Sequence, residues 1–90
     1  MKKYVIEREI PGIERLRSEE LKGAAATSNA ALSQLASRVQ WLESFVTKDK
    51  TFCIYLAEDE AAIEEHARLS GFPATRISEV TTIIDPTTAG

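Results

Sequence analysis

The sequence predicts an α+β fold in which two helices cover one face of a four-stranded antiparallel sheet. Short runs rich in Val, Ile, Tyr and Phe recur along the 90 residues. Two stretches with helical spacing separate them. A polar connection, residues 47–50, joins the second and third runs and suits a hairpin. The predicted order is therefore strand, helix, strand, strand, helix, strand.

The first strand and first helix are predicted from alternation and from end signals. Residues 3–9 alternate in polarity from Val5 onward and end at the turn pair Pro11-Gly12. The helix is expected over residues 18–36, with Ser18 as N-cap and glutamates in its first turn, where the helix dipole favours acids. The side chains expected to face the sheet recur every three or four residues: Leu21, Ala25, Ser28, Leu32 and Leu35.

The middle of the chain predicts two strands. Residues 39–46 contain Trp41 and form the second strand. Residues 51–57 form a continuous apolar run, which indicates a central strand buried on both faces. Cys53 and Tyr55 would then share one face of this strand.

The second helix and the last strand complete the pattern. The helix is expected from about Asp59, a capping residue, to Ser70, with Gly71 in the left-handed position that ends it. Residues 77–84 predict the fourth strand, and residues 85–90 are expected to fray. This order is the ferredoxin-like split β-α-β arrangement, in one domain spanning residues 1–90.

The second face of the sheet predicts a homodimer. Cys53 and Tyr55 share one face of the third strand, and Phe52, Ile54 and Leu56 share the other. Neither set is polar enough for open water, so the face that the helices leave uncovered is expected to be apolar. A thin core is also typical of a chain this short. A second copy packed against the sheet face would cover these residues.

Composition excludes several classes of function. The net charge is −3 and the basic residues are scattered, which argues against nucleic acid as a partner. The sequence has no long apolar run for a membrane, and its single cysteine excludes an internal disulfide, so a cytoplasmic protein is expected. It also lacks the motifs of nucleotide binding and serine hydrolysis.

His66, Glu7 and Cys53 are the candidate metal ligands. His66 is the only histidine, and its helical position points it inward, as either a hydrogen-bonded core residue or a site. Its own helix offers few further ligands, so these would come from the sheet or from a second chain. Glu7 is a mid-strand carboxylate, with Glu9, Glu43 and Glu79 as rivals. Cys53 is either a small core residue or a thiolate ligand.

Short blocks throughout the chain resemble a family of small bacterial domains of unknown function, of which a nickel-binding protein is the described type. The blocks are residues 4–12, 40–41, 44–47, 53–55, 65–68, 71–74 and 84–88. The resemblance implies a ferredoxin-like fold, a homodimer and nickel binding in at least one member, but no established enzymatic activity. Glu7, Cys53 and His66 lie within these blocks as metal-capable residues.

Three functional hypotheses follow. The first is a small metal-binding homodimer, with Ni²⁺ as the metal and His66 as the anchor. The second is a cofactor-independent enzyme of oxygenase or isomerase type, with His66 as general base; a deep pocket lined by Trp41, Tyr55 and His66 would favour it. The third is a dimeric module that senses a small ligand.

Overall fold

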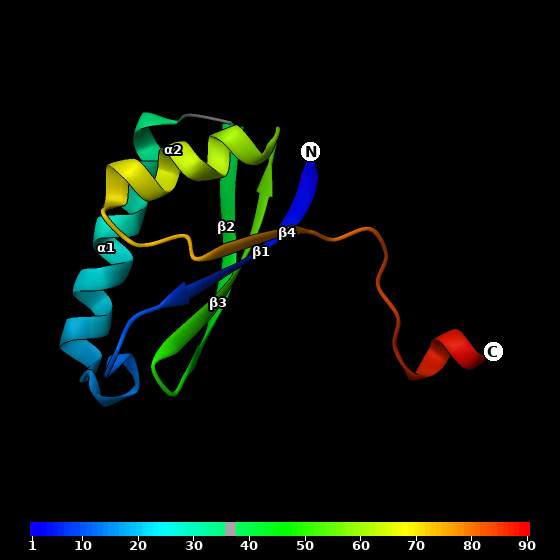
Figure 1. The fold of residues 1–90 in the computed structure, drawn as a ribbon, viewed down its shortest axis with the longest axis horizontal. Coiled ribbons are helices and arrows are strands. Elements are labelled where there is room, and N and C mark those ends of the chain that lie inside the picture. The colour runs from blue at the N-terminus through cyan, green and yellow to red at the C-terminus, as the bar shows by residue number, and fades with distance from the viewer. Residues whose placement is uncertain (36–37) are drawn as a thin grey trace.

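The computed structural model describes residues 1–35 and 38–90, and it confirms the predicted fold class. The strands are β1 (Lys2–Glu9), β2 (Val39–Thr47), β3 (Lys50–Ala57) and β4 (Arg76–Glu79). They form one antiparallel sheet in the order β2-β3-β1-β4, which is the ferredoxin-like order. The helices α1 (Ser18–Gln34) and α2 (Glu60–Ser70) cover one face of the sheet (Figure 1).

The start of α1 differs from the prediction by one residue. Arg17, not Ser18, is the N-cap, and Ser18 is the first helical residue. The physical reason is that Glu20 accepts a hydrogen bond from the backbone N–H of Arg17 at 3.2 Å. The backbone N–H of Arg17, which has no partner within the helix, is therefore hydrogen-bonded by Glu20, and Ser18 is not needed as the cap. Ala36, the predicted last residue of this helix, lies outside the described residues.

Both predicted ends of α2 are confirmed. Asp59 is the N-cap, and its carboxylate accepts a hydrogen bond from the backbone N–H of Ala62 at 2.9 Å. Gly71 ends the helix with φ 78°, a left-handed conformation that glycine adopts without strain.

Strand β4 is shorter than predicted. It pairs only with residues Tyr4 to Glu7 of β1, and its last bond runs from the Val80 N–H to the Lys3 carbonyl at 2.8 Å. Because β1 begins at Lys2, residues beyond Val80 have no strand left to pair with. The chain leaves the sheet there (Figure 1) and ends in a 3₁₀ turn, Pro86–Ala89. A second 3₁₀ turn, Ile13–Arg15, follows β1 and was not predicted.

The core lies between the sheet and the helices. Its fully buried side chains include Ile6 from β1, Tyr55 from β3 and Ile63 from α2. Strand β3 is central, as predicted, but only every second residue is buried; Phe52, Ile54 and Leu56 are half-buried on the other face. No helix in the described ranges has the length and hydropathy needed to cross a membrane.

The Asp59 cap should stabilise the whole fold, because α2 covers the core. We expect Asp59→Ala to lower the free energy of unfolding by about 1 kcal/mol. Asp85→Ala is the matched control, since Asp85 caps only the exposed turn at the C-terminus. That control should change stability by less than about 0.5 kcal/mol. Urea unfolding measures the free energy of unfolding of both variants. Equal decreases in the two would contradict a stabilising role for the Asp59 cap.

Candidate functional site

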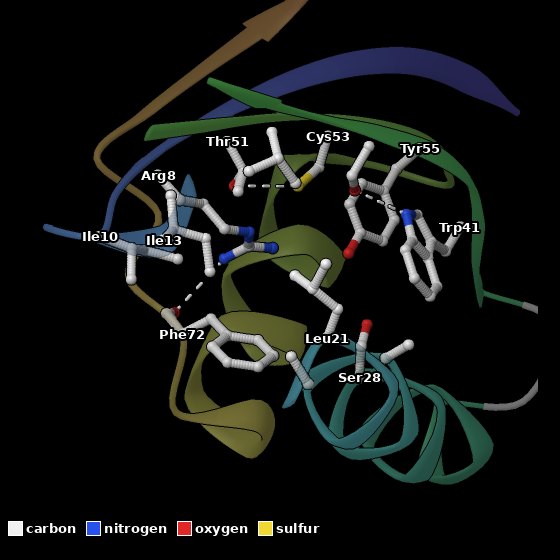
Figure 2. A pocket seen from close by; sticks show the side chains of 14 residues that line it. Arg8, Ile10, Ile13, Leu21, Ser28, Trp41, Thr51, Cys53, Tyr55 and Phe72 are labelled. Atoms are coloured by element: carbon white, nitrogen blue, oxygen red, sulfur yellow. Dashed lines mark hydrogen bonds between the residues drawn. The ribbon is translucent and has the colours of Figure 1, made fainter. Parts of the chain in front are cut away.

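A cavity lies between the buried face of the sheet and α1, and it is the candidate site. Its volume is about 120 Å³. Figure 2 shows side chains from the β1 region, α1 and β3 converging on it. Apolar residues form most of its wall, and the polar groups among its lining side chains belong to Arg8, Ser28, Trp41, Ser44, Thr51, Cys53 and Tyr55.

Arg8 is the charged residue of this cavity, and sequence analysis missed it. The alternation of β1 places Arg8 on the same face as Tyr4 and Ile6, so its side chain enters the interior and is only 2% exposed. Nη1 donates to the backbone carbonyl oxygens of Phe72 at 3.3 Å and Pro73 at 2.8 Å. Nη2 is buried and has no hydrogen-bond partner in the described residues. The strand alternation was the signal that could have identified it.

His66 lies behind the cavity rather than in its wall. It is fully buried, as its helical position predicted. Nε2 lies 3.2 Å from the Oγ of Ser28, and which of the two groups donates depends on the imidazole tautomer. Nδ1 is buried without a partner in the described residues. The ring packs against Tyr55, with ring centroids 5.2 Å apart and planes inclined by 52°.

Burial dominates the protonation of both aromatic groups. It lowers the pKa of His66, and the nearby positive charge of Arg8 lowers it further, whereas hydrogen bonding with Ser28 opposes the change. Burial raises the pKa of Tyr55, and Arg8 and the Ser28 hydroxyl offset part of that increase. The site therefore favours a neutral imidazole and a neutral phenol beside a permanent guanidinium charge.

The three residues predicted as metal ligands lie on two sides of the sheet. Cys53 is buried on the helix-covered face, and its Sγ lies 3.4 Å from the Oγ1 of Thr51. Glu7 lies on the opposite face, where it pairs with Lys50 at 3.8 Å. Within residues 1–35 and 38–90, no group of three or more His, Cys, Asp or Glu side chains is placed to hold a metal ion. The predicted ligands Glu7 and Cys53 thus do not lie together in one chain.

The pocket predicted for an enzyme is present in part. Trp41 and Tyr55 line it, while His66 reaches it only through Ser28 and Tyr55. A general base must come within hydrogen-bond reach of the proton that it removes. Through its contacts with Ser28 and Tyr55, His66 is one side chain removed from a ligand in the cavity.

Comparisons with known proteins agree on the fold. A family model described as "Nickel responsive protein SCO4226-like" matches residues 4–80. The crystal structure of SCO4226 from Streptomyces coelicolor A3(2) is similar with a TM-score of 0.74, covering 91% of this chain and 99% of that chain. The sequence identity is 16%, so this likeness supports the fold alone. None of the curated proteins compared with the chain matches it.

The lowered pKa of His66 should make the fold sensitive to acid. The unfolded chain begins to protonate its imidazole near pH 6.5, whereas the folded protein does so only at lower pH. Below that pH the unfolded state binds more protons, so stability falls as the pH falls, by at most about 1.4 kcal/mol per pH unit.

We expect His66→Gln to remove this part of the pH dependence. Free energies of unfolding would be measured with urea from about pH 8 to about pH 5, with a chelator present, for the wild type and the variant. Because the chain has one histidine, the difference between the two curves isolates this group. Parallel curves over the whole range would show that burial does not shift the His66 pKa.

Proposed function

Because the chain belongs to the SCO4226-like family of nickel-responsive proteins, we propose that it binds nickel as a homodimer, with metal donors supplied by both copies. The observation that supports this proposal is the open face of the sheet. This face combines an apolar centre with carboxylates, whereas the described residues of one chain offer no complete group of metal donors.

The open face is the side of the sheet away from the helices. The register aligns Phe45 with Phe52 and Val5 with Ile54 across neighbouring strands, so their side chains share that face. Phe45 is 53% exposed, and Val5, Phe52 and Ile54 are half-buried. Contiguous apolar side chains on a soluble protein mark an interaction surface.

A second copy of the same chain suits this face. Charged residues of both signs lie around its apolar centre on the same side of the sheet: Lys3, Glu7, Glu43, Lys50 and Arg76. In a two-fold dimer one patch meets itself, so the patch must carry both signs to be complementary. Packing of two such faces would remove Phe45 and its apolar neighbours from water.

Glu7 is the donor of the predicted set that lies at this face. Its carboxylate is half-buried on the open side, and oxygen donors are among those that bind divalent transition metals. His66 and Cys53 are buried on the other side of the sheet. The sheet itself separates them from Glu7, because the register places Ile6, not Glu7, opposite Cys53. We therefore propose that Glu7 binds the metal at the interface between two copies. His66 and Cys53 are the alternative ligands, and Ni²⁺ titration of their variants distinguishes them from Glu7.

Dimer formation is tested by placing a charge within the apolar part of the open face, at Phe45 of the edge strand β2. We expect the wild type to sediment at about twice the 9.9 kDa mass of one chain. Phe45→Lys should sediment as a folded monomer, because a lysine there would be buried without a partner. Ile83→Lys adds the same charge at an exposed position beyond the sheet, 67% exposed, and should stay dimeric. A monomeric wild type, or a dimeric Phe45→Lys, would contradict the interface.

Nickel binding is tested by calorimetric titration of the untagged protein with Ni²⁺. Glu7→Gln should weaken binding at least tenfold, which corresponds to about 1.4 kcal/mol. Glu64→Gln, which removes an exposed carboxylate from α2, is the matched control and should not change the affinity.

His66→Gln and Cys53→Ser complete the series and locate the site. Unchanged affinity in both supports the donor on the open face. A loss of affinity in either variant, with Glu7→Gln unaffected, would place the metal under the helices instead. No measurable heat in the wild type would reject nickel binding itself.

A further inference from the structure

The interior cavity has properties that nickel binding does not explain. Its volume of about 120 Å³ approaches that of an engineered apolar cavity of about 150 Å³ that binds benzene. It therefore suits a ligand of about six heavy atoms. Leu21 and Val46, both partly exposed, are among its lining residues, so the cavity reaches the surface.

The cavity contains a positive charge that lacks a counterion. Of the lining residues that the structure describes, Arg8 alone is charged. The ion pairs found in residues 1–35 and 38–90 do not involve Arg8. Figure 2 shows its guanidinium group directed into the cavity. Two backbone carbonyls and the face of the Tyr55 ring, 5.9 Å away, accommodate part of the charge, but Nη2 has no partner.

A buried charge without a counterion is unfavourable even when carbonyls accept part of its hydrogen bonds, and an anion bound beside Nη2 would lower that cost. The planar guanidinium of arginine matches the two oxygens of a carboxylate. The hydroxyl groups of Tyr55 and Ser28 face the same space (Figure 2) and can hydrogen-bond to such a group. The remaining wall is apolar, including Ile13, Ala25 and Phe72, and would contact a hydrocarbon body.

We propose that this cavity binds a small organic monocarboxylate, with the unpaired Nη2 of Arg8 holding the carboxylate and the apolar wall holding the hydrocarbon part. The site is separate from the open face: Arg8 and Glu7 are neighbours in β1 whose side chains lie on opposite sides of the sheet. The two proposals can therefore fail independently, and nickel is absent from the experiment below.

The test is an NMR titration of the full chain with isobutyrate, in the presence of a chelator and at constant ionic strength. The protein has one tryptophan, and the indole N–H of Trp41, which donates to Ser44 at 2.9 Å, lies in the cavity wall and supplies one identifiable signal. We expect saturable shifts with a dissociation constant on the order of 1 mM, as suits a ligand this small.

Isobutyramide has the same shape without the charge and is the matched ligand control. It should bind at least about tenfold more weakly, because the charge-assisted hydrogen bond is lost. Equal binding of the acid and the amide would overturn the proposal. Inorganic phosphate that bound as tightly as isobutyrate would also overturn it, because the apolar wall would then contribute nothing.

Variants assign the binding to this cavity. Arg8→Met should weaken isobutyrate binding at least about tenfold, whereas Arg15→Met, which removes an exposed charge outside the cavity, should leave it unchanged. Because Arg8 also bonds two carbonyls, a second variant keeps Arg8 and fills the space: Ala25→Leu, at a lining position of α1. It should abolish the Trp41 shifts. Wild-type affinity in a folded Ala25→Leu would overturn the assignment.

Discussion

The pairing of β1 with β3 at the centre of the sheet is the constraint on which the other contacts depend. It places Tyr4 opposite Tyr55, Ile6 opposite Cys53 and Arg8 opposite Thr51, all on the face that the helices cover. The side-chain period of a strand is two residues, so a shift of one residue would exchange the two faces. Glu7 would then enter the core. The apolar alternation therefore fixes which residues are available to each possible site.

The same alternation accounts for the buried arginine. Arg8 follows Tyr4 and Ile6 at intervals of two residues, so the strand carries its charge into the interior. Its Nη1 donates hydrogen bonds to the carbonyl oxygens of Phe72 and Pro73, which follow the left-handed Gly71. The Arg8 side chain thus connects β1 with the segment that follows α2. Its charge also lowers the pKa of His66, in the same direction as burial, and the pKa of Tyr55, where it opposes the effect of burial.

The two faces of the sheet separate two kinds of chemistry. The open face joins apolar surface with carboxylates, and it is the face for which we propose assembly and metal coordination between copies. The covered face has a mostly apolar cavity with one guanidinium group and neutral hydrogen-bonding groups, which suits a small anion with an apolar body. His66, on the buried side of α2 and hydrogen-bonded to Ser28, belongs to the second environment.

The sequence by itself determined the features that depend on local interactions. The order of the elements, the Asp59 cap, the Gly71 helix end and the inward direction of His66 all follow from periodicity and from residues a few positions apart. Only the tertiary structure decided the features that depend on distant partners. The length of β4 is limited by where β1 begins. The separation of Glu7 from Cys53 depends on the register between β1 and β3, which places Ile6 opposite Cys53 and directs Glu7 to the other face, and His66 lies on the Cys53 side because the helices cover that face. The cavity and the unpaired Nη2 of Arg8 depend on how side chains from distant parts of the chain pack, which no local pattern encodes.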